Sequence, residues 1–379
     1  MRRDEDRNTP GTDATTKVVI LGGGFAGLSC AAALQGHGLD VTLVDKHDYN
    51  TFQPLLYQVA TAGLNPGDVT YPFRNLTRMY GVQRFRRGRA TGVSTDPGKP
   101  GGVLETDAGP LPFDYLVVAC GAATNFFGVA GAEENALAIY NVDDSLSVRK
   151  RLFANMEHAA AFGGANGELT VAVVGGGATG VEMAGALAEL QDLALRTTFK
   201  ELSGAGARVI LVEQRDRLLG AFEESLAGYA ERELRRRGVE MRLSTAVLEV
   251  GTDFVSVATD GQDEEKIPCG LVVWAAGVGP EGFAATLTVP KLRGRIVVDE
   301  TLRVPGVPGV FAVGDAAAGL LVRSARAEST DGDRSLIPQL AQPAIQTGKH
   351  AALEILGELA GRQRRSFVYL DKGTMATIG

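Results

Sequence analysis

The chain of 379 residues is poor in the side chains that build covalent and metal sites. Its three cysteines, Cys30, Cys120 and Cys269, lie far apart, so they predict no disulfide framework and fit a reducing compartment. No Ser/His/Asp catalytic set is evident. The histidines show no metal-ligand spacing, so we expect no metal: His37, His47, His158 and His350.

Long apolar runs and basic stripes are also missing. No run reaches the roughly 18–20 apolar residues of a transmembrane helix. A net charge of −7 argues against nucleic acid as a partner. The densest basic cluster, Arg84–Arg89 (RFRRGR), has a solvated strand edge as its simplest interpretation. Residues 1–16 lack the apolar segment of a secretory or twin-arginine signal, and we expect a disordered lead-in.

One stretch of the chain predicts a dinucleotide site. In Thr16–Lys46 an apolar strand (Lys17–Leu21) is followed by a glycine-rich turn, an alanine-rich helix (Phe25–Gln35) and a second strand (Asp40–Val44). The turn has the spacing G-x-G-x-x-G, which suits a tight turn, close approach to a pyrophosphate and close helix packing. Its residues, with the acid that would bind a ribose, are Gly22, Gly24, Gly27 and Asp45.

The same unit occurs a second time. Leu169–Leu187 repeats the strand, turn and helix, and Arg208–Glu213 supplies the next strand with its acid, Glu213. The intervening Glu189–Gly206 lengthens the helix and connection. Two such sites in one chain predict an α/β protein with two Rossmann-like domains, and hydride transfer between two dinucleotides. The second set of glycines is Gly175, Gly177 and Gly180.

Other stretches leave two interpretations open. Lys46–Gly63 reads as a loop and short helix that either lines a planar ligand or lies on the surface. Tyr115–Cys120 is a buried strand that ends at Gly121, where backbone can approach a ligand. Asp315, after the strand Val310–Val313, either binds a ribose or polyol hydroxyl or caps a helix.

A glutamine-bearing helix is expected within Leu336–Leu356. Pro343 fits the first helical position, which makes Gln342 a neighbour of the N-cap. Gln342 and Gln346 are four residues apart and therefore share a face. They could bind a quinone carbonyl, or the helix could be an ordinary amphipathic surface helix.

Several of these motifs together resemble the type II NADH:quinone oxidoreductases, which belong to the two-dinucleotide-binding flavoproteins of the pyridine nucleotide-disulfide oxidoreductase type. The motifs are GGGFAGL, FQPLLYQVATAG, GGGATGVEMAGALAEL, FAVGDAA, AQPAIQTG and DKGTMATIG. The resemblance covers Lys17 to Gly379. It implies FAD in the first site, NADH in the second, hydride transfer to flavin N5 and two-electron transfer to a membrane quinone without proton pumping.

The resemblance also implies roles for individual residues. For FAD it implies Gly22, Gly24, Gly27, Asp45, Lys46, Gln53, Gly121, Asp315 and Gln342. For NADH it implies Gly175, Gly177, Gly180, Glu182, Glu213 and Gly277. Around the quinone it implies Gln342, Gln346 and Met375, and it gives catalytic roles to Glu182, Gln342, Gln346 and Lys372. Glu182 could instead only interact favourably with the helix dipole.

Missing residues narrow the choice within the superfamily. Disulfide reductases carry a cysteine pair soon after the first ribose acid, and Asp48–Gly63 contains no cysteine. The three cysteines do not resemble the redox pair of sulfide:quinone reductases either. Glu213 should favour NADH because a carboxylate repels the 2′-phosphate of NADPH, although Arg215 and Arg217 lie nearby.

The expected domains are an FAD-binding domain at 17–145 and 285–365 and an NADH-binding domain at 146–284. Residues 366–379 would begin a C-terminal segment that family members use to reach the membrane; we expect either that the sequence is truncated within it or that the protein works without that anchor. With that segment, the family location is the cytoplasmic face of the inner membrane; without it, the protein would stay in the cytoplasm. Homodimerisation is a family expectation. A soluble NADH:acceptor reductase or NADH oxidase and a non-catalytic NADH-sensing flavoprotein remain as alternatives.

Overall fold

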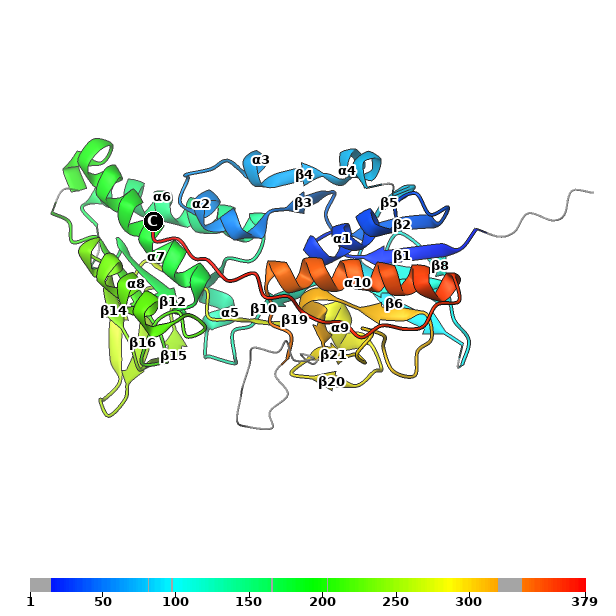
Figure 1. Ribbon diagram of the computed structural model, residues 1–379. Coiled ribbons are helices and arrows are strands. Elements are labelled where there is room, and N and C mark those ends of the chain that lie inside the picture. Colours follow the sequence, from blue (N-terminus) through cyan, green and yellow to red (C-terminus); the bar gives the residue numbers. More distant parts are fainter. Residues whose placement is uncertain (1–14, 81, 97, 165, 203, 320–335) are drawn as a thin grey trace, which may run out of the picture. The chain divides into compact units, whose positions relative to one another are not determined.

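The computed structural model describes residues 15–80, 82–96, 98–164, 166–202, 204–319 and 336–379 (Figure 1). The chain forms two compact units. Unit 1 consists of Met1–Asp48, Pro72–Gly121 and Glu281–Leu370, and unit 2 of Tyr49–Tyr71, Ala122–Pro280 and Asp371–Gly379. Most of the expected lead-in, residues 1–14, lies outside the described residues.

Unit 1 is built around a five-stranded parallel sheet with the order β22-β9-β1-β2-β5. Its central strand, KVVIL, is buried from its second residue onward, as expected of a continuous apolar run in a parallel sheet. The strands are β1 (Lys17–Leu21), β2 (Asp40–Asp45), β5 (Arg84–Arg87), β9 (Tyr115–Val118) and β22 (Val310–Ala312). Two three-stranded sheets accompany it: β6 (Ala90–Thr95), β7 (Gly102–Thr106) and β8 (Leu111–Phe113), and β20 (Lys291–Leu292), β21 (Arg295–Val297) and β23 (Ala317–Ala318).

Two helices of unit 1, α1 (Phe25–Leu34) and α10 (Ala341–Leu359), lie against each other beside this sheet (Figure 1). Glycine permits this close approach, because a Cβ at Gly348 would lie 2.0 Å from the carbonyl oxygen of Ala26. Small residues of both helices share one core with the sheet. The shorter helices are α4 (Phe73–Met79), α9 (Gly282–Thr286) and the 3-10 turn η3 (Gly314–Ala316).

Unit 2 has a parallel sheet of its own, with the order β11-β18-β12-β13-β14. Its strands are β11 (Leu137–Ala138), β12 (Thr170–Val174), β13 (Arg208–Val212), β14 (Glu240–Arg242) and β18 (Leu271–Trp274). The long helices are α6 (Val142–Phe162), α7 (Ala178–Thr197) and α8 (Glu224–Arg236). Short elements are η1 (Gln53–Leu55), α2 (Leu56–Ala60), α3 (Pro66–Val69), α5 (Ala132–Asn135) and η2 (Lys200–Leu202). The remaining strands are β3 (Tyr49–Thr51), β4 (Thr70–Pro72, whose last residue belongs to unit 1), β10 (Ala122–Thr124), β15 (Thr245–Val250), β16 (Phe254–Thr259), β17 (Glu265–Pro268) and β19 (Val278–Pro280).

The two units repeat one chain path, which confirms the predicted duplication and the α/β fold class. In each, a central strand leads through a glycine turn and a helix to its neighbour, then to the next strand outward. A three-stranded antiparallel sheet follows in both, and the chain then returns beside the central strand as β9 or β18. The helix is 10 residues long in α1 and 20 in α7, in line with the predicted longer connection.

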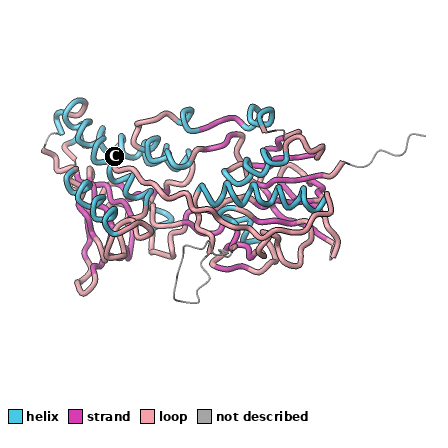
Figure 2. Tube along the Cα trace, viewed as in Figure 1, coloured by secondary structure: helices cyan, strands magenta, loops and turns pink. Residues whose placement is uncertain are grey.

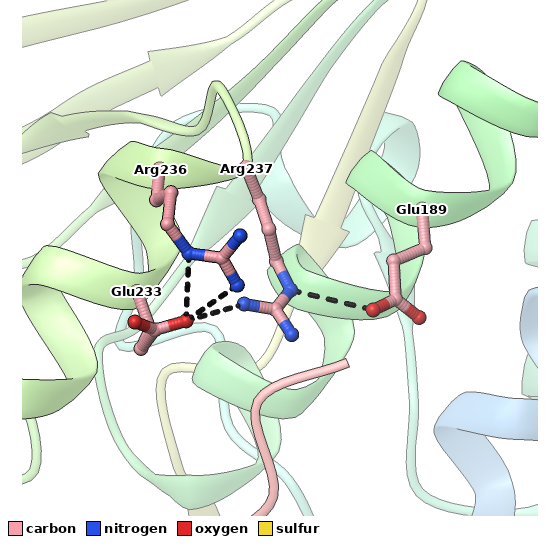
Figure 3. Close-up of polar contacts among 4 residues, drawn as sticks. All are labelled: Glu189, Glu233, Arg236 and Arg237. Atoms are coloured by element: carbon pink, nitrogen blue, oxygen red, sulfur yellow. Dashed lines mark hydrogen bonds and ion pairs between the residues drawn. The ribbon is translucent and has the colours of Figure 1, made fainter.

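Charged side chains join α7 and α8 within unit 2 (Figure 3). Arg237, which follows α8, donates to Glu233 of that helix at 2.9 Å and to Glu189 of α7 at 3.3 Å. Arg236 donates to the same oxygen of Glu233 at 2.8 Å. The two arginines keep the pKa of Glu233 below its usual value.

The start of α10 differs from the prediction. The helix begins at Ala341 with Leu340 as N-cap, so Pro343 is its third residue and Gln342 its second. Proline is tolerated there because the first four N–H groups of a helix have no partner within the helix. After α10 the chain continues to Gly379 without helix or strand (Figure 2). Within the described ranges no helix is long and apolar enough to cross a membrane.

Candidate functional site: two dinucleotide cradles

The first glycine cradle lies in unit 1 between β1 and α1. Gly22 has φ +104°, and a Cβ there would lie 2.2 Å from the carbonyl oxygen of Ala119. A Cβ at Gly27 would lie 1.8 Å from the oxygen of Gly22, so these two glycines are needed by the fold itself. A Cβ at Gly24 would meet no atom within 4 Å. Gly24 therefore borders open space at the N-terminus of α1, where N–H groups are available to an anion.

Asp45 lies at the end of β2 and faces this cradle. Its carboxylate accepts hydrogen bonds from the backbone N–H of Gly23 at 2.7 Å and of His47 at 2.9 Å. The adjacent Lys46 forms an ion pair with Glu281 at 3.5 Å. The acid predicted to bind a ribose thus also fixes the shape of the glycine turn.

Asp315 lies in η3, directly after β22. Within the described ranges its carboxylate has neither a hydrogen bond nor an ion pair. Burial raises its pKa to about 6, and the positive charge of Arg295 opposes this shift. Arg295 is itself buried; its Nη2 donates to the oxygen of Ile337 at 2.9 Å, and its Nε has no partner in the described part of the chain. These unsatisfied polar groups fit a site that takes a polar ligand.

The second cradle lies in unit 2 between β12 and α7 and repeats the geometry of the first. Gly175 has φ +109°, and a Cβ there would lie 2.7 Å from the oxygen of Ala275. A Cβ at Gly180 would lie 1.7 Å from the oxygen of Gly175, whereas one at Gly177 would meet nothing within 4 Å. The open position is again the glycine at the helix N-cap.

Glu213 follows β13 and lines a cavity of about 530 Å³ beside the second cradle. Its carboxylate accepts from the N–H of Gly176 at 2.5 Å and from the N–H of Arg215 at 2.8 Å. The side chains of Arg215 and Arg217 line the same cavity, and Arg217 also donates to the oxygen of Gly220 at 3.1 Å. The cavity is large enough for part of a nucleotide and carries both charge signs.

Glu182 lies in the first turns of α7 and contacts the C-terminal segment. Burial raises its pKa, and a hydrogen bond from the N–H of Thr377 at 3.2 Å acts in the opposite direction. The hydroxyl of Thr377 lies 2.8 Å from that of Tyr57, to which Gln58 donates at 3.1 Å. Glu182 is therefore part of a polar chain within unit 2.

The remaining predicted positions are divided between the units. In unit 1, Gln342 is half-buried and its side chain has no hydrogen bond to a described residue, while the amide of Gln346 binds the backbone of Leu370. Gly121, also in unit 1, has φ +74°. In unit 2, Gln53 donates to the oxygen of Tyr140 at 3.2 Å, and a Cβ at Gly277 would lie 2.8 Å from the ring of Phe127. Two further positions of unit 2 are exposed: Lys372 and Met375.

Two residues near the first cradle were not predicted. Thr347 of α10 accepts the N–H of Gly314 at 3.0 Å and donates to the oxygen of Pro343 at 2.8 Å, so it connects α10 to η3. Its place in the AQPAIQTG motif was a usable signal. Arg295 had none, because only the tertiary structure buries its guanidinium close enough to Asp315 to affect it.

The cysteines carry no reactive thiolate. Burial raises the pKa of each of the three thiols to about 12, which keeps them protonated and poorly nucleophilic: Cys30, Cys120 and Cys269. Cys30 is a buried core residue of α1, as predicted. Among the described residues, no group of three or more His, Cys, Asp or Glu side chains could hold a metal ion.

Sequence comparison places these cradles in a known family. The profile of the pyridine nucleotide-disulphide oxidoreductases matches residues 16–348. A type II NADH:quinone oxidoreductase of Mycobacterium tuberculosis is 34% identical over 373 residues, which cover 96% of this chain and 77% of that protein. The type II NADH:quinone oxidoreductase of Staphylococcus aureus is 30% identical over 371 residues, which cover 96% of this chain and 87% of that protein.

Solved structures share the fold. NDH2 from Plasmodium falciparum in complex with NADH matches with a TM-score of 0.85 at 22% identity, over 96% of this chain and 88% of that one. The sulfide:quinone oxidoreductase of Aquifex aeolicus matches with a TM-score of 0.70 at 20% identity, over 92% of this chain and 78% of that one. With two glycine cradles, each followed by its acid, and 34% identity over 96% of its length, this chain belongs to the type II NADH:quinone oxidoreductase family of the pyridine nucleotide-disulphide oxidoreductases.

Proposed function

We propose that this protein is an FAD-dependent, non-proton-pumping NADH:quinone oxidoreductase, with FAD in the unit 1 cradle and NADH in the unit 2 cradle. One observation carries the proposal. The second cradle, with Glu213 at its cavity, repeats the first within a chain that is 34% identical to a type II NADH:quinone oxidoreductase over 96% of its length. Two dinucleotide sites in one chain suit hydride transfer between two cofactors.

The residues of unit 1 fit FAD. The open side of Gly24 and the N-terminus of α1 suit a pyrophosphate, and Asp45 suits a ribose hydroxyl. Asp315 offers a carboxylate without a described partner to a further hydroxyl, and the Nε of Arg295 offers a buried donor. Bound there, FAD supplies the chemistry of taking a hydride from NADH and giving two electrons to a quinone.

In unit 2 the chain orients NADH. Gly177 and the N-terminus of α7 suit the pyrophosphate of the nucleotide, and Glu213, which also accepts from the N–H of Gly176, would accept hydrogen bonds from the adenosine ribose. The carboxylate would repel a 2′-phosphate, which favours NADH over NADPH. Because the hydride donor needs only to be held in place, positioning supplies most of the rate.

Few side chains need to act chemically. We assign Glu182 to proton handling, because its raised pKa keeps a proton on its carboxylate at a higher pH than an exposed glutamate does. We assign Gln342, Gln346, Lys372 and Met375 to the quinone side of the reaction, on their match to family motifs. Since the acceptor is a membrane quinone, we also propose that the protein works as a peripheral homodimer at the cytoplasmic face of the inner membrane.

Stopped-flow absorbance on purified protein tests the proposal. NADH should bleach the flavin rapidly and NADPH more slowly, and a soluble quinone should then restore the colour. Bleaching without recolouring by quinone would favour a soluble NADH:acceptor reductase. Tight NADH binding with slow reoxidation by every acceptor would favour an NADH sensor. Purification without bound flavin would contradict the proposal at its first step.

A further inference from the structure

Unit 1 contains a second hollow, lined by strands of the same sheet as the first cradle. The cavity has a volume of about 870 Å³, within the range typical of small-molecule sites. We call it the arginine cavity after its cations: Lys17, Arg74, Arg84, Arg86 and Arg87. Arg87 pairs with Asp45 of the first cradle, and the other four are not cradle residues.

The register of the sheet explains why three of the five cations gather. Val19 of β1 pairs with Thr42 of β2, which pairs with Arg84 of β5. Side chains two residues apart on a strand share a face, so Lys17 and Arg86 project to the same side as this row, whereas Phe85 and Arg87 alternate with Arg84 and Arg86 and project to the other side. β5 is the edge strand of the sheet. The RFRRGR cluster is therefore not only a solvated edge, because its first four residues line a cavity around this edge strand.

The charge of the arginine cavity is out of balance. Its lining contains five cations and one carboxylate, Asp40, which gives a formal charge of +4 in a chain whose net charge is −7. Asp40 forms an ion pair with Arg84. Arg86 and Arg87 reach only carbonyl oxygens, at 3.5 and 3.3 Å, and no described carboxylate neutralises them. A focused positive potential of this kind attracts anions.

Much of the arginine cavity is separate from the cradle. Lys17, Asp40 and Arg84 are the first residues of their strands, whereas Gly22 and Asp45 lie at the carboxyl ends. The four steps of β1 from Lys17 to Leu21 span about 13 Å. Dinucleotides bind outside the carboxyl ends of parallel strands, so the amino-end part of the cavity is not explained by FAD.

We propose that the arginine cavity binds a soluble small molecule that carries two or more phosphate groups. Guanidinium groups bind phosphate oxygens through two parallel hydrogen bonds, and three cations on one side of the sheet, Lys17, Arg84 and Arg86, suit a diphosphate better than a single phosphate. Apolar side chains, among them Val19, Phe85 and Leu111, leave room for a less polar part of the ligand. Arg74 lies 5.7 Å from the ring centre of Phe85, so the cation and the aromatic surface are adjacent.

Calorimetric titration of the FAD-loaded protein with inorganic pyrophosphate tests this site, in the presence of saturating NAD⁺ so that both cradles are filled. The test variant is Arg84→Gln/Arg86→Gln. The matched control is Arg232→Gln/Arg235→Gln, which removes two exposed cations from α8. We expect pyrophosphate to bind at least about tenfold more tightly than orthophosphate, the test variant to lose at least about tenfold in affinity, and the control to stay within about twofold.

Equal pyrophosphate binding by the test variant and the wild type would overturn the proposal, as would binding no tighter than that of orthophosphate. A phospholipid headgroup could offer the same phosphate chemistry to the arginine cavity. This alternative is tested in the same series with vesicles of phosphatidylglycerol and phosphatidylcholine. Vesicle binding that depends on Arg84 and Arg86, without pyrophosphate binding, would overturn the assignment to a soluble ligand. Unchanged flavin reduction by NADH and an unchanged unfolding midpoint in the test variant would show that lost pyrophosphate binding is not due to misfolding.

Discussion

The side-chain amide of Gln346 forms two hydrogen bonds with the backbone of Leu370. Its Nε2 donates to the carbonyl oxygen at 2.9 Å, and its Oε1 accepts the N–H at 3.0 Å. The amide therefore pairs with Leu370 as the backbone of a neighbouring β-strand residue would, and it holds the segment after α10 in place. Only its second N–H and second lone pair remain for a quinone.

Replacing Gln346 with leucine should release this segment. Each lost hydrogen bond is worth about 1 kcal/mol, so we expect amide exchange at Leu370 and its neighbours to accelerate by roughly tenfold or more. Hydrogen–deuterium exchange of the flavin-loaded protein measures this. Gln342→Leu is the control, since the side chain of Gln342 has no hydrogen bond to the described residues. Unchanged exchange in Gln346→Leu together with a raised KM for quinone would mean that Gln346 serves the quinone and not the segment.

Asp315 predicts an unusual pH dependence of stability. Its pKa is raised to about 6 from an ordinary value of 3.8, so the folded state binds the proton more tightly than the unfolded state does. The stability that this proton provides is complete below pH 4 and is lost as the pH rises through 6. In flavin-free protein, Asp315→Asn should thus raise the free energy of unfolding by about 1–3 kcal/mol at pH 8 and hardly at pH 4.

Urea unfolding between pH 4 and pH 8 measures how the free energy of unfolding changes with pH. The control is Asp96→Asn, at an exposed position. The same Asp315→Asn change should weaken FAD binding by at least about tenfold at pH 8, since it replaces a charged acceptor of ligand hydroxyls. A variant less stable than the wild type at pH 8 would contradict the proposed cost of burying this carboxylate.

Substitutions at two glycines of the second cradle should distinguish an effect on nucleotide binding from an effect on folding. Gly177→Ala adds a methyl group to open space and should leave the free energy of unfolding within about 1 kcal/mol of wild type. It should still raise the KM for NADH by at least about tenfold, because the methyl group occupies the path of the pyrophosphate. Gly180→Ala, which places a Cβ 1.7 Å from the oxygen of Gly175, should destabilise unit 2 by about 1–3 kcal/mol or more.

Unfolding curves and NADH kinetics on the two variants decide this. Both should retain FAD, which we place in the other cradle, and Gly24→Ala should show the converse loss of FAD with an intact fold. If Gly177→Ala lost FAD and kept its NADH kinetics, the assignment of the two cofactors would be reversed.

Glu213 should set the choice between NADH and NADPH. Glu213→Gln removes the charge that repels a 2′-phosphate and leaves Arg215 and Arg217 in the cavity. We expect the ratio of kcat/KM for NADH to that for NADPH to fall by at least about tenfold. Steady-state kinetics with both nucleotides measure the ratio. An unchanged ratio would show that selectivity is set elsewhere in the cavity.

Much of this architecture was predictable because its signals are local. The turn at Gly22 needs φ +104°, and that at Gly175 needs φ +109°, which side-chain-bearing residues rarely adopt. A buried parallel strand needs a continuous apolar run, and β1 and β12 both have one. The start of α10 was predicted wrongly from Pro343. Proline is tolerated at several positions in the first turn of a helix, so its presence does not identify which of these positions it occupies.

The sequence by itself thus determined the two glycine cradles, their acids and the duplicated α/β fold, since each depends on neighbours within one strand–turn–helix unit. Only the tertiary structure decided the environment of Asp315, the hydrogen bonds of Gln346 to Leu370 and the gathering of cations in the arginine cavity. Each of these depends on burial or on the register between segments far apart in the chain. Such distances and desolvation arise only when the sheet and helices pack, and no local pattern of residues encodes them.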